Sequence, residues 1–239
     1  MATIQPSRRP AWLNALIDLA QSCAELVDWR PSSPQDEASH QVTYDAGYYQ
    51  LVEETATWSR DAMADSIVRD LAPRNILDIG CGTGALLEAF RTRNVRVDGL
   101  EYSDAGIEAC HKRELWVNKF DIARQRLPKR LRGRDVVVSF EVAEHLPERM
   151  ANRYLRLLTA ASDTVVLSAA TPGQGGTSHL NEQPHEYWIR KMANRGYEFD
   201  WVLSQWWREE WRGRTADWYQ ANVMVFRRPQ KAQKLAKAA

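Results

Sequence analysis

The sequence predicts an α/β fold in which a mostly parallel sheet carries helices on both faces. From residue 75 to residue 195, short apolar runs bounded by Gly, Asp and Pro alternate with amphipathic helical patterns. Such alternation implies right-handed crossovers between parallel strands. A chain of 239 residues with 44% hydrophobic content can build one domain with a substantial core, whereas two domains would be cramped.

The elements are expected in a simple order along the chain. Apolar residues at three- and four-residue spacing predict helices over 12–29 and 56–71, the second ending near Pro73. Strands are expected at 75–80, 95–101, 115–120, 135–140 and 163–169. Helices are expected at 85–93, 104–113, 147–161 and 184–195. The segments 197–211 and 218–226 look strand-like and predict an antiparallel hairpin at the sheet edge.

Charge and cysteine content exclude several classes of protein. Lys and Arg number 32 against 31 for Asp and Glu, so nucleic acid is not the favoured partner. Cys23, Cys81 and Cys110 are odd in number and widely spaced, which argues against a disulfide framework or a zinc cluster. No run reaches the roughly 18 apolar residues of a membrane span, and no signal peptide is recognisable. A cytoplasmic protein without a membrane partner is expected.

A glycine-rich turn follows the first predicted strand, in residues 75–84 (NILDIGCGTG). Gly80, Gly82 and Gly84 allow a sharp turn and a close approach to a ligand, although glycines alone would suit any tight turn. Glu101 ends the next strand, about 20 residues later, where a carboxylate can accept bonds from two ribose hydroxyls. A dinucleotide is the rival ligand. Asp78 beside the turn would repel a pyrophosphate and suits a cationic amino-acid ligand.

The segments LDIGCGTG, GLEYS and FEVAEHLP resemble the motif series of class I S-adenosylmethionine-dependent methyltransferases over about residues 75–205. This resemblance implies a Rossmann-like, seven-stranded sheet with the hairpin strand last. It implies that Asp78 and the three glycines surround the methionine part and that Glu101 holds the ribose. It further implies an adenine site with Asp121 on the exocyclic amine and Tyr102 and Ile122 on the ring faces. Phe140 completes the expected cofactor set. A surface role for Asp121 and a core role for Ile122 are the alternatives.

An acidic cluster with a histidine follows the fourth predicted strand, at the sheet edge where ligands bind in open α/β folds. If this segment turns helically, Glu141, Glu144 and His145 share one face. They suit a divalent ion such as Mg²⁺, which would help a bound hydroxyl to lose its proton. The ExxEH pattern resembles metal-dependent O-methyltransferases, in which a further histidine completes the site; His179 is the first candidate and His185 the second. Two alternatives remain.

In the first alternative, His145 acts directly as a general base beside Glu144. In the second, Glu144 charges the start of the next helix and His145 is an ordinary packed residue. The segment 171–188 (TPGQGGTSHLNEQPHEYW) is expected either to wall the acceptor pocket or to be a plain connecting loop.

Aromatic residues are abundant, with ten tryptophans in the chain. Five of them crowd the proposed hairpin, at Trp201, Trp206, Trp207, Trp211 and Trp218. A homodimer interface or a plain core is favoured for them over a substrate platform. Tyr44, Tyr48 and Tyr49 precede the fold, as in relatives whose N-terminal segment closes over the cofactor, and are candidate lid residues.

The sequence therefore predicts three regions: an N-terminal helical extension and candidate lid (1–55), a methyltransferase domain (56–227) and a disordered tail (228–239). The predicted activity (EC 2.1.1) transfers a methyl group from S-adenosyl-L-methionine to a hydroxyl of a small molecule or saccharide, leaving S-adenosyl-L-homocysteine. One alternative is an RNA ribose methyltransferase, whose basic stripe is offered only by residues 124–134 and the tail. Another is a non-catalytic cofactor-binding subunit, against which Glu101 and the acidic cluster argue.

Overall fold

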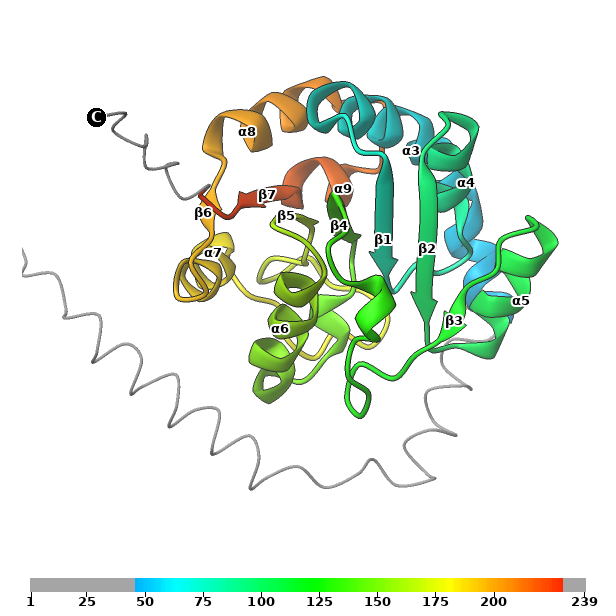
Figure 1. The fold of residues 1–239 in the computed structure, drawn as a ribbon, viewed down its shortest axis with the longest axis horizontal. Coiled ribbons are helices and arrows are strands. Elements are labelled where there is room, and N and C mark those ends of the chain that lie inside the picture. Colours follow the sequence, from blue (N-terminus) through cyan, green and yellow to red (C-terminus); the bar gives the residue numbers. More distant parts are fainter. Residues whose placement is uncertain (1–45, 230–239) are drawn as a thin grey trace, which may run out of the picture. The chain divides into compact units, whose positions relative to one another are not determined.

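The computed structural model describes residues 46–229, which form a seven-stranded sheet in the order β3-β2-β1-β4-β5-β7-β6 (Figure 1). The first five strands run parallel, while β7 is antiparallel to both β5 and β6. The bounds are β1 Asn75–Ile79, β2 Arg96–Glu101, β3 Asn118–Lys119, β4 Val136–Ser139, β5 Thr164–Leu167, β6 Glu198–Phe199 and β7 Met224–Arg227. The predicted fold class and sheet size are confirmed.

The first five strands lie where the sequence predicts them, although β3 is shorter than expected. Only two residues of the predicted 115–120 pair with β2. Leu115 instead turns inward, where it is buried against Cys110 beneath the glycine-rich turn. An edge strand has a partner on one side only, so burial of Leu115 outweighs a longer ladder.

Helices follow β1, β2, β4 and β5 as predicted, whereas only a 3₁₀ turn, Lys129–Leu131, lies between β3 and β4. The bounds are α3 Ala46–Leu71, α4 Ala85–Thr92, α5 Asp104–Lys112, α6 Ala151–Ala161 and α7 His185–Ala193. α3 begins ten residues before the predicted 56–71. α5 begins at a capping serine, Ser103, whose hydroxyl accepts the backbone N–H of Gly106. α6 follows a short 3₁₀ turn at Glu148–Met150, so the α-helix itself starts after the predicted Pro147.

The prediction for the C-terminal part was wrong in its secondary structure. Most of the segments expected to be strands form α8 (Trp201–Glu210) and α9 (Asp217–Asn222), and only β6 and β7 are extended. The antiparallel β6–β7 pair exists, but two helices connect its strands. Asp200 caps α8 by accepting the backbone N–H of Leu203 at 3.0 Å. Trp207 and Trp211, four residues apart, then point to the same buried side.

The sheet lies between two helical layers, each with its own apolar core. On one face, β1, β4, β5 and β7 pack with α3, α4 and α8. On the other face, the same sheet packs with α6 and α7. Trp207 and Trp211 are fully buried and stack with ring centroids 5.6 Å apart. These two tryptophans therefore belong to the core, which was one of the two interpretations favoured from the sequence. Trp201 and Trp206 are exposed on α8.

Several predictions fall outside residues 46–229, among them the helix over 12–29, Cys23, Tyr44 and the tail from residue 230. Across residues 46–229, no helix combines the length and the apolar character needed to cross a membrane.

Candidate cofactor and acceptor site

The glycine-rich turn joins β1 to α4, and steric crowding explains two of its three glycines. Gly80 and Gly84 have φ angles of 80° and 76°, a region that L side chains rarely adopt. A Cβ at Gly80 would lie 2.5 Å from a methyl group of Val142, and one at Gly84 would lie 2.9 Å from Sγ of Cys110. The turn thus packs directly against the segment that contains the acidic cluster.

Glu101 ends β2 directly beside this turn. Its carboxylate accepts backbone N–H bonds from Gly82 at 2.8 Å, Tyr102 at 2.8 Å and Ser103 at 2.9 Å. Burial raises the pKa of Glu101, and these three donors oppose that shift. A buried carboxylate held in one orientation at the carboxyl end of a strand can accept hydroxyl groups from a ligand.

Asp78 lies on β1, one strand away from Glu101, and is buried as well. Burial, and then the charge of Glu101, raise the pKa of Asp78 to about 8. Two acids in one buried site disfavour each other's ionised forms. A cationic ligand placed between the two acids would offset the repulsion between their ionised forms. The cationic amino-acid ligand predicted from the sequence would have this effect.

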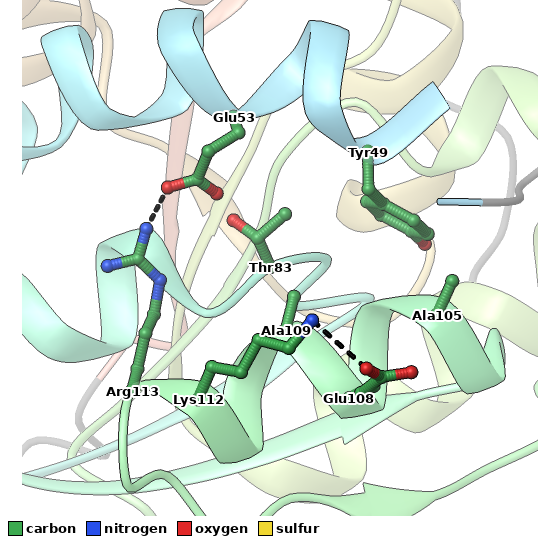
Figure 2. Close-up of a pocket in the computed structure, with 8 residues that line it drawn as sticks. All are labelled: Tyr49, Glu53, Thr83, Ala105, Glu108, Ala109, Lys112 and Arg113. Atoms are coloured by element: carbon green, nitrogen blue, oxygen red, sulfur yellow. Dashed lines mark hydrogen bonds and ion pairs between the residues drawn. The ribbon is translucent and has the colours of Figure 1, made fainter. Parts of the chain in front are cut away.

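Tyr49, in the first turn of α3, lies against Glu101. Its hydroxyl donates to Oε1 of Glu101 at 3.3 Å, and its ring lies over Gly82 and Gly106. Tyr49 also lines a cavity of about 330 Å³ between α3 and α5 (Figure 2). In this cavity Glu53 pairs with Arg113 and Glu108 pairs with Lys112, so its charged groups neutralise one another.

The predicted adenine-side residues already have partners within the fold. Oδ1 of Asp121 accepts the backbone N–H groups of Ala123 at 2.7 Å and Arg124 at 3.2 Å, which caps the turn after β3. Ile122 is half-buried against the core. The ring of Phe140 packs against Trp211, with centroids 6.3 Å apart. Ligand contacts of these residues and of Tyr102 stay predictions.

The acidic cluster after β4 adopts a different local structure from the predicted helical turn. Glu141 has a φ of 52°, and a 3₁₀ turn begins only at Ala143 and ends at His145. Ligand atoms of Glu144, His145 and His179 nevertheless lie within 4.8 Å of one another. Glu141 is outside this group of three, and Ser168 donates to its carboxylate at 2.7 Å.

Glu144 is fully buried beside the two histidines. One oxygen accepts the backbone N–H of Ala170 at 3.3 Å, and the other, Oε2, has no hydrogen-bond donor among the residues that the structure describes. Burial, and then the neighbouring carboxylate of Glu141, raise the pKa of Glu144. The two carboxyl groups can share a hydrogen bond only if one is protonated. A proton or a cation is required to balance them.

His179 reaches this cluster from the loop after β5. Its Nδ1 lies 2.9 Å from Oε1 of Glu182, and its ring packs edge-on against His145, with centroids 5.1 Å apart. His185, the second candidate, lies elsewhere: its Nδ1 is 3.3 Å from a guanidinium nitrogen of Arg208. Burial, and then the charge of Arg208, lower the pKa of His185.

The structure adds two residues to the site that the sequence did not single out. Tyr219 on α9 is the first: burial, and then the charge of Glu141, raise the pKa of its hydroxyl, which places it near the acidic cluster. Glu182 is the second, and its spacing of three residues from His179 was a detectable signal. Tyr48, a candidate lid residue, lies close enough to Glu144 and Glu101 for both charges to raise the pKa of its phenol, after burial.

Comparison with known proteins gives a family match and several fold matches. A family described as "Methyltransferase domain" matches residues 52–196, more than half of the chain. A ubiquinone biosynthesis O-methyltransferase of Saccharophagus degradans is 36% identical over 142 residues, which cover 53% of this chain and 55% of the relative. The chain thus spans about half the length of this relative and 36% of the corresponding Pseudomonas aeruginosa enzyme, with 32% identity.

Two solved structures show the same fold. An amino pentose methyltransferase from Micromonospora echinaspora with bound S-adenosylmethionine gives a TM-score of 0.54 at 20% identity, covering 72% of this chain and 92% of that one. The magnesium protoporphyrin IX methyltransferase of Synechocystis gives a TM-score of 0.52 at 14% identity, covering 94% and 100%.

Proposed function

The chain belongs to the methyltransferase domain family, and we propose that it transfers a methyl group from S-adenosyl-L-methionine to a hydroxyl oxygen of a small molecule or saccharide. The observation that carries the donor assignment is the buried acid pair of Asp78 and Glu101 around a glycine turn. A sulfonium amino acid attached to a ribose matches both its charge and its hydrogen-bonding capacity.

Each end of the donor has suitable residues in this proposal. Asp78 and the turn Gly80–Gly84 face the methionine part, where the ammonium and sulfonium charges offset the acids. Glu101 accepts hydrogen bonds from the ribose hydroxyls, which replace the hydrogen bond from the Tyr49 hydroxyl to Oε1. Tyr102, Asp121 and Ile122 border the adenine, as the sequence resemblance implies.

The acceptor is expected beside Glu144, His145 and His179. Methyl transfer is an in-line displacement, so the pocket must align the acceptor oxygen with the methyl group and remove its proton. Either His145 takes this proton directly, or a divalent ion such as Mg²⁺ is held by Glu144, His145 and His179 with Glu141 beside them. The unpartnered Oε2 of Glu144 and the unbalanced carboxyl pair fit a cation. When bound, such an ion would lower the pKa of the acceptor hydroxyl.

The choice of a small acceptor is supported by charge and by relatives. Three arginines of the basic segment 124–134 are occupied within the fold: Arg124 pairs with Asp121, Arg130 with Asn118 and Arg134 with Asp98. Few basic side chains of this segment are then left to bind the phosphates of a polynucleotide. The matched relatives include an O-methyltransferase of ubiquinone biosynthesis and a methyltransferase of an amino pentose.

Calorimetry with S-adenosylmethionine tests the donor assignment. We expect binding by the full chain and a loss of affinity of about 10- to 100-fold in Glu101→Gln, because hydrogen bonds to a charged group contribute about 1.5–3 kcal/mol. Asp98→Asn, on the same strand but outside the site, serves as the control and should bind normally. No binding by the wild-type chain, or unchanged binding by Glu101→Gln, would refute the assignment.

Chelation separates the two hypotheses for proton removal. If a metal takes part, EDTA and Glu144→Gln should both abolish turnover with a phenol or sugar acceptor found by screening, and Mg²⁺ should restore the wild type. If His145 acts alone, EDTA should have no effect and only His145→Asn should abolish turnover. Indifference to all three changes would exclude the cluster from catalysis.

A further inference from the structure

The loop after β5 contains an unusual arrangement around one carboxylate. Oε1 of Glu182 lies 2.9 Å from Nδ1 of His179 and accepts the backbone N–H of Gly175 at 2.8 Å. Oε2 accepts the backbone N–H of Gly173 at 2.7 Å. Backbone N–H groups of the loop therefore hold both carboxylate oxygens in place. The imidazole of His179 faces a carboxylate whose orientation is fixed.

The position of the His179 ring is also constrained from its other side. Gly176 has a φ of 151°, and a Cβ built on it would lie 2.4 Å from Nε2 and 2.6 Å from Cε1 of His179. No side chain at this position is compatible with the observed ring. The ring is confined between the backbone of Gly176, the carboxylate of Glu182 and the ring of His145.

We propose that Glu182 is the positioning residue of His179: its carboxylate takes the Nδ1–H, leaves Nε2 unprotonated, and so sets the tautomer of the imidazole that lies beside Glu144 and His145. A histidine that accepts a proton or binds a metal needs one defined unprotonated nitrogen, and a hydrogen bond to the other nitrogen selects it. Because Glu182 is ionised when it accepts three N–H groups, it can only accept from His179. This fixes the tautomer as well as the ring orientation.

The consequence for catalysis rests on the proposed function, since it assumes that His179 works with Glu144 and His145. The tautomer itself does not depend on that assumption. Glu182 also ties His179 to the Gly173–Gly176 turn, so the same side chain anchors the loop and orients the imidazole. A test must distinguish orientation from simple anchoring.

Histidine-ring ¹⁵N spectra of the 239-residue chain at pH 8 provide this test, with the His179 signals assigned by their loss in His179→Asn. We expect the Nδ1–H tautomer in the wild type. In Glu182→Gln the side-chain amide can donate to Nδ1, so the Nε2–H tautomer should increase. Glu186→Gln, an equal charge change at an exposed position of α7, should leave the His179 signals unchanged. An Nε2–H tautomer in the wild type would overturn the proposal.

Kinetics supply the second readout. Glu182→Gln should lower kcat by about 10- to 100-fold, the usual effect of losing a residue that orients a histidine, with the KM for S-adenosylmethionine and the Tm unchanged. A loss of Tm with unaltered kcat would show a purely anchoring role and refute positioning. If the wild-type tautomer is as expected but His179→Asn is fully active, the positioning of His179 stands and the proposed role of the cluster fails.

Discussion

The affinity for S-adenosylmethionine, taken relative to that of an Asp78→Asn variant, should rise by about 50-fold between pH 6 and pH 8. The pKa of Asp78 is raised to about 8 without a ligand, so about 1% of this carboxyl group is ionised at pH 6 and about half at pH 8. A cationic ligand favours the ionised form, which lowers the pKa in the complex. Binding therefore releases a proton, and the affinity increases with pH until the carboxyl group is ionised in the unliganded protein.

The ligand's own amino group also titrates near this range, so the wild type must be compared with Asp78→Asn. The asparagine variant reports the titration of the ligand alone, and the ratio of the two affinities isolates Asp78. Asp98→Asn is the matched control, because Asp98 lies on the neighbouring strand β2, opposite Leu77 of β1, and pairs with Arg134. Its pH dependence should equal that of the wild type.

Isothermal titration calorimetry at several pH values, repeated in two buffers of different ionisation enthalpy, measures both the affinity and the number of protons released. We expect the wild type to release close to one proton more than Asp78→Asn at pH 6 and about half a proton more at pH 8. A wild-type to Asp78→Asn ratio that stays constant with pH would show that Asp78 is already ionised without ligand. The interpretation of Asp78 and Glu101 as an unbalanced acid pair would then be wrong.

Four further substitutions test the surroundings of the site. Tyr49→Phe removes one donor that competes with the ribose and should tighten S-adenosylmethionine binding by about 2- to 10-fold; weaker binding in calorimetry would contradict this. Gly176→Ala should displace the ring of His179 and lower kcat by about 10- to 100-fold without loss of donor binding; normal turnover would show that the ring is not needed there. In urea unfolding, Trp211→Ala should cost about 3–5 kcal/mol and the exposed Trp201→Ala less than about 0.5 kcal/mol; equal effects would refute the core assignment.

The arrangement of residues at the proposed cofactor site was predictable because these residues are adjacent to regular elements. The glycine turn and Glu101 each follow a short apolar strand, and parallel strands bring their carboxyl ends to one edge. For Asp78, the negative charge beside the turn was enough to predict a cationic ligand. By contrast, the C-terminal helices were missed because Val and Trp favour strands in isolation. Their helical face is selected by distant partners: Trp207 donates to Asp70 at 2.7 Å and Trp211 to Ser66 at 3.0 Å.

For the proposed acceptor site, the sequence predicted which residues come together but not their geometry. The sequence placed Glu144, His145 and His179 in one site, yet it expected a helical turn that the left-handed backbone of Glu141 prevents. No sequence feature marked Tyr219 as a residue near the site, because only tertiary packing brings α9 close to it. Glu182 could have been linked to His179 by spacing alone, but only the turn at Gly173–Gly176 shows that its carboxylate is fixed.

The proposed donor and acceptor sites each contain a pair of acids that needs a positive charge or a proton to balance it. Asp78 with Glu101 and Glu141 with Glu144 both contain a carboxyl group whose pKa is raised by burial and by the other acid. The cation of the donor can balance the first pair, whereas the second needs a metal ion, a cationic acceptor or a retained proton. A retained proton would keep Glu144 neutral and leave His145 as the base. A metal ion would require Glu144 to ionise, so metal binding would release a second proton, and calorimetry of the donor complex with Mg²⁺ would detect it.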